Sequence, residues 1–300
     1  MPELPEVETI RRDLDRELSA RRIEGVEARG SRSIRRHSDP AEFAVALVGA
    51  TVESVARRGK YLLFPLDRGG RLVVHLGMSG QLLLAGPDDP MMAHTHVVLT
   101  FDGARQLRFV DPRTFGEVFV SGGSGGSGAS GVSGVSGVSG VSGVGAAAAL
   151  GAAELAHLGA DPLHDLKGWG DLAERLHARR SRLKPLLMDQ RFLAGIGNLY
   201  ADEILFAARL RYDRTSDGLT PAEVRRLYRA MTVTLNSAIS HRGSSLADEQ
   251  YRDVFGRIGD FQSRHRVYGR EGRPCRRCRQ TIVRIKTGGR STFLCPRCQP

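Results

Sequence analysis

Long apolar runs are missing from this 300-residue sequence, and so is the basic and then apolar N-terminal stretch of a secretion signal. A membrane-spanning helix needs roughly 20 consecutive apolar residues. A signal peptide has a charged start and an apolar centre, whereas this chain opens with Pro and Glu after Met1. We therefore expect a protein that has no membrane partner and stays in the cytoplasm.

Lysine is scarce, yet the chain is strongly basic. Lysine supplies only four of the 44 basic residues, and the net charge is +11. Twelve Lys or Arg side chains, against two acidic ones, lie from Arg257 to Pro300. Such a concentrated positive field suits a polyanion, because phosphate contacts release condensed counterions. Charge alone leaves a solubilising surface open as the alternative to a nucleic-acid partner.

The spacing of apolar residues predicts an α+β protein. Residues 5–20 place apolar side chains on one face of a helix, with Pro5 in its first turn. From about residue 23 to residue 120, short apolar runs are separated by Gly, Asp and Pro. This pattern is typical of antiparallel strands, and we expect an N-terminal β-sandwich with flanking helices.

A low-complexity segment follows at residues 122–145, where Ser-Gly-Val is repeated five times from Ser130 to Val144. Such a stretch cannot bury enough apolar surface to offset its ordering entropy. We interpret it as a flexible tether, and we favour a tolerated repeat in a surface loop over a dedicated function.

Helices dominate after residue 146, and the clearest one spans Thr220 to His241. Thr220 and Glu223 form a capping box, Pro221 suits the first helical position, and Gly243 suits the end. A small basic module with all the cysteines begins at Arg266. The expected domains are a β-sandwich at 1–121, a linker at 122–149, a helical domain at 150–265 and a zinc module at 266–300.

The zinc prediction rests on two Cys-x-x-Cys pairs, Cys275 with Cys278 and Cys295 with Cys298. Four thiolates at this spacing match a tetrahedral structural zinc site that leaves no position for a catalytic water. Two disulfides, which are rare in the cytosol, and a redox dithiol are the alternatives.

The N-terminal octapeptide Met-Pro-Glu-Leu-Pro-Glu-Val-Glu holds a candidate nucleophile. If Met1 is removed, Pro2 becomes a terminal secondary amine. An α-amino group has a pKa of about 7.7–8.0, against about 10.4 for lysine, so much more of it is neutral near pH 7.5. Such an amine can attack a sugar carbon and form an iminium, and Glu3 could move protons beside it. The alternative interpretation is ordinary acidic chemistry at a helix start.

Several motifs, in this order along the chain, resemble the bacterial formamidopyrimidine-DNA glycosylase family. They cover the chain except residues 122–149. They are the opening octapeptide, Lys60-Tyr61-Leu62-Leu63, His75 to Gly80, Asp111 to Gly116, Lys184 to Asp189, Gly195 to Ala201, Val267 to Arg270 and the cysteine module.

The resemblance implies a catalytic set. Pro2 matches the proline that forms a Schiff base with the sugar of the damaged nucleotide, and Glu3 matches the acid that assists sugar opening and base loss. Glu6 matches a further acid of that pocket. Lys60 matches a proton donor for β-elimination, although a phosphate contact alone is the alternative. Arg290 matches a zinc-finger arginine linked to δ-elimination.

The resemblance also implies DNA-contacting residues. Met78, Arg113 and Phe115 match the side chains that fill the gap left by an extruded base, a task that suits apolar wedges and an arginine. Composition alone would place Met78 and Phe115 in a core. His94 matches a phosphate contact, whereas we expect His96 to be a neutral core histidine.

Residues 195–198 resemble the turn of the family's helix-two-turn-helix element, where glycines let the backbone approach a phosphate. Asn198 and Lys184 match phosphate contacts. Arg179 aligns less specifically with a basic DNA contact. The region 244–262, where the family places its lesion-contacting loop, matches only loosely.

The resemblance, together with the basic charge and the cysteine pairs, implies a monomeric base-excision repair enzyme that binds damaged double-stranded DNA, in a basic cleft between the two domains, and one structural zinc ion. We expect it to remove oxidised purines, chiefly 8-oxoguanine and formamidopyrimidines, and to cut the strand by β,δ-elimination. It needs neither a nucleotide cofactor nor a catalytic metal. The alternatives are an endonuclease VIII-type enzyme for oxidised pyrimidines and a non-catalytic zinc-containing nucleic-acid-binding protein.

Overall fold

The computed structural model describes residues 1–122, 153–246 and 250–300, and most of the predicted tether at 122–149 lies outside these residues. The described chain forms two compact units. The first comprises Met1, Ile10–Ala156 and Arg252–Arg257, and the second comprises Pro2–Thr9, His157–Tyr251 and Ile258–Pro300. None of the helices in these ranges is long and apolar enough to cross a membrane.

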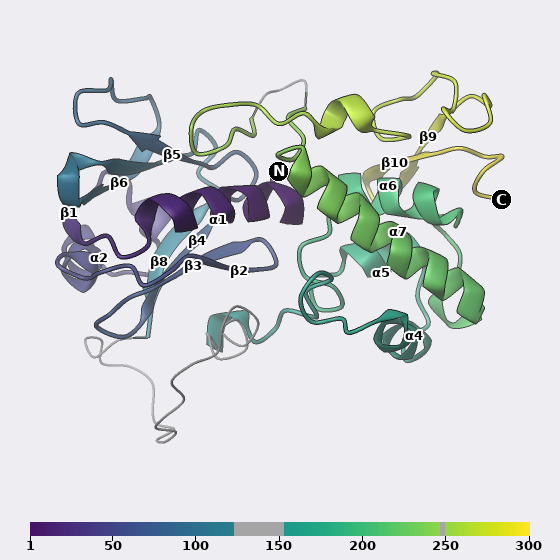
Figure 1. The fold of residues 1–300 in the computed structure, drawn as a ribbon, viewed down its shortest axis with the longest axis horizontal. Coiled ribbons are helices and arrows are strands. Elements are labelled where there is room, and N and C mark those ends of the chain that lie inside the picture. Colours follow the sequence, from purple (N-terminus) through teal and green to yellow (C-terminus); the bar gives the residue numbers. More distant parts are fainter. Residues whose placement is uncertain (123–152, 247–249) are drawn as a thin grey trace. The chain divides into compact units, whose positions relative to one another are not determined.

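Figure 1 shows the α-helices and strands of the described residues and labels all of them except β7. The helices are α1 (Leu4–Leu18), α2 (Pro40–Leu47), α4 (Trp169–His177), α5 (Leu183–Met188), α6 (Asn198–Ala208) and α7 (Pro221–Ser240). The strands are β1 (Ile23–Ala28), β2 (Ala56–Arg58), β3 (Tyr61–Pro65), β4 (Arg71–His75), β5 (Gln81–Ala85), β6 (Thr95–Phe101), β7 (Gln106–Val110), β8 (Glu117–Ser121), β9 (Val283–Thr287) and β10 (Arg290–Leu294).

The first unit is the expected β-sandwich, built from two four-stranded antiparallel sheets in the orders β1-β6-β7-β5 and β2-β3-β4-β8. The three central residues of β3 and of β4 are all buried, so both faces of that sheet are covered. Residues 252–257 return to this unit, where the Leu84 N–H donates to the Val254 carbonyl at 2.8 Å. The sandwich holds the hairpins and turns that carry Lys60, Met78 and Arg113.

Helix α1 belongs to both units. Its first residues up to Thr9 group with the second unit, and the rest groups with the first. The predicted apolar stripe of Val7, Ile10, Leu14 and Leu18 is buried along the whole helix. An apolar face that continues through three turns explains why one helix forms across the boundary.

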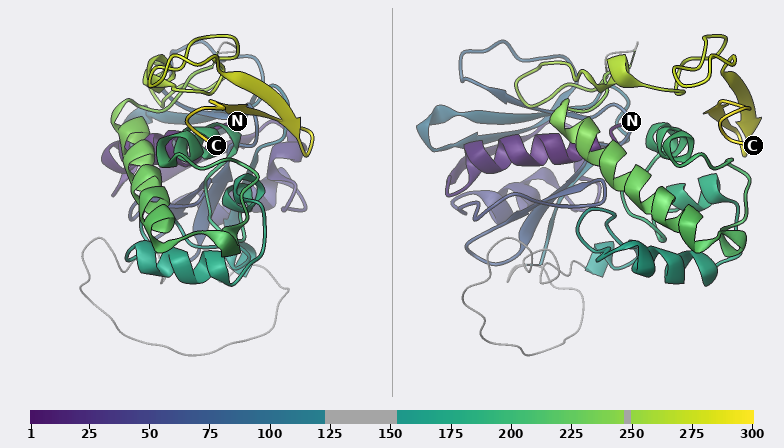
Figure 2. Two further views of the ribbon diagram at one scale, coloured as in Figure 1. Left: turned by 90° about the vertical axis from the view of Figure 1, so that its right-hand side faces the viewer. Right: turned by 45° about the vertical axis from the view of Figure 1, so that its right-hand side comes forward.

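The second unit is helical, and α6 and α7 pack side by side at its centre. The capping box at α7 is confirmed: Thr220 Oγ1 accepts from Glu223 N at 3.3 Å, and the Glu223 carboxylate accepts from Thr220 N at 2.9 Å. The apolar stripe of this helix lies in the main core cluster of the unit and consists of Val224, Leu227, Met231, Leu235 and Ile239. Strands β9 and β10 form an antiparallel hairpin in the zinc module, which contacts α6 and is seen from two further sides in Figure 2.

Candidate active site and zinc centre

Glu3 is fixed by the first turn of α6. Its buried carboxylate accepts hydrogen bonds from the backbone N–H groups of Gly197 (2.7 Å), Leu199 (3.0 Å) and Tyr200 (3.3 Å). These are N–H groups that a helix start leaves without intrahelical partners, and the positive end of the helix favours an anion. The residue after Pro2 is thus held in one orientation by a segment almost 200 residues away.

Glu6 lies one turn along α1 and is also buried. Its Oε1 accepts from Tyr200 Oη at 2.6 Å and from Ser244 N at 2.8 Å, and its Oε2 accepts from Glu3 N at 2.9 Å. Burial raises the pKa of Glu6 to about 7, and the charge of Glu3 adds to the rise, while the bond from Tyr200 opposes it. Glu6 can therefore hold or release a proton near neutral pH.

Three glycines make room for this N-terminal segment. A Cβ at Gly197 would lie 2.5 Å from the Glu3 carboxyl carbon, and one at Gly243 would lie 2.7 Å from Glu6 Oε1. A Cβ at Gly195 would meet Leu4 at 2.8 Å. We expected the 195–198 glycines to admit a phosphate; the structure shows that Gly195 and Gly197 already admit the side chains of α1 and Glu3.

Lys60 lies in the tight turn between β2 and β3 and is 8% exposed. Next to it, the buried Arg57 donates to the Gly59 carbonyl at 3.0 Å. His75 on the adjoining strand stays neutral, because burial lowers its pKa to about 4 and the positive charge of Lys60 contributes. Its Nδ1 accepts from Gly77 N at 3.2 Å, which anchors the start of the Met78 turn.

Met78, Arg113 and Phe115 come from two turns that Asp111 joins. Met78 is 40% and Phe115 47% exposed, so neither is a core residue. The Asp111 carboxylate is fully buried, and it accepts from Ser79 Oγ at 2.6 Å. It also accepts from the backbone N–H groups of Arg113 (3.2 Å) and Gly116 (2.7 Å). One acid therefore fixes the loops of all three proposed wedge residues.

His94 and His96 differ in exposure. His94 is exposed, has a positive φ of 63°, and its carbonyl accepts from Asp111 N at 3.0 Å. His96 is half-buried, and its Nε2 lies 2.9 Å from the Asp111 carbonyl. Both therefore help to hold the start of the Arg113 loop.

Lys184 and Asn198 both contact the zinc-module hairpin. The buried ammonium group of Lys184 lies 2.7 Å from Asp202 Oδ1, and it donates to Ser291 O and Thr292 Oγ1 at 2.9 Å each. Asn198 Nδ2 donates to the same Ser291 carbonyl at 3.0 Å. The ammonium group is thus paired with Asp202 of α6 and donates two hydrogen bonds to β10.

Arg290 is the first residue of β10, and it is exposed after the Gly288-Gly289 turn. Its strand is tied to α6, because Asp202 Oδ2 also accepts from Phe293 N at 2.9 Å. Arg179 is exposed too, and Arg179 Nη1 lies 2.9 Å from Asp189 Oδ2. Both guanidinium groups can reach a ligand from the surface.

The four cysteines of the zinc module meet in one cluster. Their Sγ atoms all lie within 4.8 Å of one another, and none of the four forms a disulfide. The Cys275–Cys298 and Cys278–Cys295 Sγ distances are 4.0 and 3.4 Å. A tetrahedral zinc with bonds of about 2.3 Å requires sulfur atoms about 3.8 Å apart. The donor set therefore fits one structural zinc ion.

Sequence reasoning missed four residues that hold the site: Tyr200, Ser244, Asp111 and Asp202. Tyr200 and Asp111 lie inside motifs that the resemblance singled out, and buried polar groups within such motifs are the signal that could have found them. Glu203 was missed too. Its carboxylate accepts from the backbone N–H groups of residues 266–268 at 2.9–3.0 Å, where the chain enters the zinc module.

Family models match three consecutive parts of the chain. The formamidopyrimidine-DNA glycosylase N-terminal domain matches residues 1–118, and the H2TH domain of the same glycosylase matches residues 158–250. A zinc finger found in FPG and IleRS matches residues 272–300. The last match agrees with the four-cysteine cluster, which is the site of one structural zinc ion.

Similarity to known proteins extends over the whole chain. A formamidopyrimidine-DNA glycosylase of Herpetosiphon aurantiacus is 40% identical, with 100% of each chain covered. The MutM (FPG) protein of Thermus thermophilus is 38% identical at a TM-score of 0.80, covering 99% of this chain and 98% of that one. The Lactococcus lactis FPG (MutM), in complex with a DNA containing Fapy-dG, is 30% identical at a TM-score of 0.81, covering 99% of each chain. With its fold, its buried N-terminal carboxylates and its four-cysteine centre, this chain belongs to the formamidopyrimidine-DNA glycosylase family.

Proposed function

We propose that this protein removes oxidised purines, 8-oxoguanine and formamidopyrimidines, from double-stranded DNA and then cuts the strand by β,δ-elimination. The solved relative bound to Fapy-dG-containing DNA supports this substrate class. The single observation that carries the proposed chemistry is the fixed Glu3 carboxylate, one residue from Pro2, with three backbone donors.

The proposed reaction starts at the Pro2 amine, freed by removal of Met1. The neutral amine attacks C1′ of the damaged nucleotide, and the bond from C1′ to the base breaks as the base leaves with a proton. Opening of the sugar ring, with a proton delivered to its oxygen, then leaves an iminium between Pro2 and C1′. We assign that proton delivery to Glu3. Glu6, whose pKa is about 7, is the adjacent proton reservoir.

The elimination steps remove a proton from the opened sugar and expel the 3′ and then the 5′ phosphate. We assign proton donation in β-elimination to Lys60 and assistance to δ-elimination to Arg290. Met78, Arg113 and Phe115 are proposed to fill the gap in the duplex. Their exposure and their common anchor at Asp111 support this role.

Phosphate contacts are proposed for His94 and Arg179, both of which have side chains at the surface. For Lys184 and Asn198 we propose a contribution through the hairpin, since both donate to Ser291 O. We also propose that the enzyme acts as a monomer in the cytoplasm, where bacterial DNA lies. The domain limits 1–121, 122–149, 150–265 and 266–300 are proposed as its functional division.

Borohydride trapping tests the proposal. Zinc-loaded protein without Met1 is mixed with a duplex that carries one 8-oxoguanine opposite cytosine, and wild type is compared with Pro2→Gly. We expect a covalent adduct that maps to residue 2 and is lost in the variant. An adduct formed only with oxidised pyrimidines would support an endonuclease VIII-type enzyme instead. Binding without any adduct or nicking would support a non-catalytic protein.

A further inference from the structure

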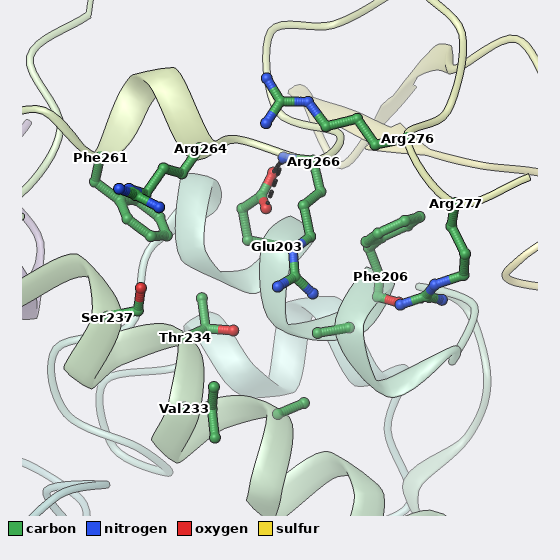
Figure 3. A pocket seen from close by; sticks show the side chains of 12 residues that line it. Glu203, Phe206, Val233, Thr234, Ser237, Phe261, Arg264, Arg266, Arg276 and Arg277 are labelled. Atoms are coloured by element: carbon green, nitrogen blue, oxygen red, sulfur yellow. Dashed lines mark hydrogen bonds between the residues drawn. The ribbon is translucent and has the colours of Figure 1, made fainter. Parts of the chain in front are cut away.

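A cavity of about 520 Å³ opens between α6, α7 and the segment that leads into the zinc module (Figure 3). The last two turns of α6 line the cavity with Glu203, Phe206 and Ala207. Glu3, in contrast, accepts hydrogen bonds at the first turn of that helix. None of the proposed catalytic, wedge or phosphate-contacting residues lines it. The cavity is therefore a separate feature of the second unit.

Four arginines line this cavity: Arg264, Arg266, Arg276 and Arg277. Arg276 Nη2 donates to Ser263 O at 3.0 Å, and Arg277 Nη1 donates to Phe206 O at 3.3 Å. Both therefore have a fixed orientation. Figure 3 shows the Arg266 side chain pointing down from the segment that leads into the zinc module, toward α6. Arginine forks suit phosphate oxygens, which they can bind in pairs.

The one acidic side chain in the lining, Glu203, offsets only one of the four arginine charges. It is buried, and its two oxygens accept four contacts of 2.9–3.0 Å from the backbone N–H groups of Arg266, Val267 and Tyr268. The lining thus keeps a net positive charge that favours an anion.

The rest of the lining is apolar with two hydroxyls. Phe206, Ala230 and Phe261 are at most 8% exposed, but Val233 on α7 leaves 55% of its surface open. Thr234 and Ser237 place hydroxyl groups beside these apolar side chains (Figure 3). A site of this volume that combines arginines with an apolar wall matches the usual make-up of an organic ligand site. A free inorganic anion would leave the apolar wall unused.

We propose that this cavity binds a nucleoside 5′-phosphate, with the phosphate held by Arg264 and Arg266 and the apolar part of the ligand against Val233. The Thr234 and Ser237 hydroxyls are available to the sugar. One wall is Phe261, whose ring centroid lies 5.8 Å from that of Tyr200, and Tyr200 donates to Glu6. A bound nucleotide thus contacts Phe261, whose ring packs beside the tyrosine that donates a hydrogen bond to Glu6.

Isothermal titration of the full-length, zinc-loaded protein with ADP, without DNA, tests this site. We expect one saturable site that Arg266→Ala weakens at least tenfold. Val233→Glu, a change at an exposed position, is expected to weaken ADP binding as strongly. The matched control is Arg229→Ala, which removes one exposed arginine of α7 that does not line the cavity. It should change the ADP affinity less than twofold.

Two comparisons separate this site from simple charge attraction. Pyrophosphate, which has no ring or sugar, should bind at least tenfold more weakly than ADP. Arg266→Ala should leave the affinity for lesion-containing duplex within twofold of wild type. The proposal fails if ADP shows no saturable binding, if pyrophosphate binds as tightly, or if Arg229→Ala has the same effect as Arg266→Ala. A parallel loss of duplex affinity would assign the arginines to DNA binding instead.

Discussion

Tyr200 Oη lies 2.6 Å from Glu6 Oε1, across 194 residues of sequence. This bond joins a carboxyl group near the start of α1 to the first turn of α6, so the geometry around the N-terminal segment depends on the helical unit. The bond also opposes the effect of burial on the pKa of Glu6, which is about 7.

The pKa of Glu6 predicts a pH-dependent contribution to stability. The folded-state pKa of about 7 lies above the ordinary value of 4.5, so the folded protein keeps a proton that the unfolded chain releases. The protonated Glu6 side chain adds up to about 3 kcal/mol to the free energy of unfolding. This stabilisation is fully present below pH 4.5 and is lost as the pH rises through 7. Urea unfolding at pH 5 and pH 8 should show wild type losing stability relative to Glu6→Gln. An equal difference at the two pH values would contradict this.

Gly197→Ala should displace the Glu3 carboxylate, because the new Cβ would lie 2.5 Å from its carboxyl carbon. We expect the rate of lesion excision to fall about a hundredfold or more, the scale of a lost proton-transfer group. Single-turnover nicking assays measure this rate. The control is Gly170→Ala, where a Cβ meets nothing within 4 Å. Near-wild-type excision by a folded Gly197→Ala protein would remove Glu3 from the mechanism.

Asp111→Ala should release the two turns that carry Met78, Arg113 and Phe115, since three donors lose their acceptor. Wedge residues are needed to extrude a base but not to process a site that has already lost one. We therefore expect nicking of an 8-oxoguanine duplex to slow much more than nicking of an abasic duplex. Asp88→Ala, at an exposed position of the same unit, is the control. Equal slowing on both substrates would argue against a positioning role.

Lys184→Met should cost about 3–5 kcal/mol of unfolding free energy, because it leaves Asp202 buried without its cation. The double variant Lys184→Met/Asp202→Asn removes both charges and keeps an acceptor for Phe293 N. It should recover most of the loss in urea unfolding. If the double variant is no more stable than the single one, the cost comes from packing and not from the unpaired charge.

Features set by neighbouring residues could be predicted from the sequence. The Thr220/Glu223 capping box, the apolar stripe of α1 and the spacing of the cysteine pairs depend on contacts within a few residues or on fixed ligand geometry. Each has the predicted form in the structure.

Features that need partners far along the chain could not be predicted. Lys184 lies 107 residues from Ser291, and Asp111 lies 32 residues from Ser79. A motif identifies these residues as important but does not say whether each faces a ligand or another part of the protein. For the same reason the sequence does not show that Leu4 and Glu3 lie against the glycines at 195 and 197.

The grouping of Pro2–Thr9 with the second unit has a consequence for biosynthesis. Glu3 bonds to Leu199, 196 residues later, and Glu6 bonds to Ser244, 238 residues later. At translation rates of 5–20 residues per second, the N-terminal segment waits about 10–50 s for these partners. Pro2 is buried once they are in place. Met1 itself stays 52% exposed in the folded structure, but Pro2 is open to an aminopeptidase only during this interval, so the proposed nucleophile can be freed before its active site exists.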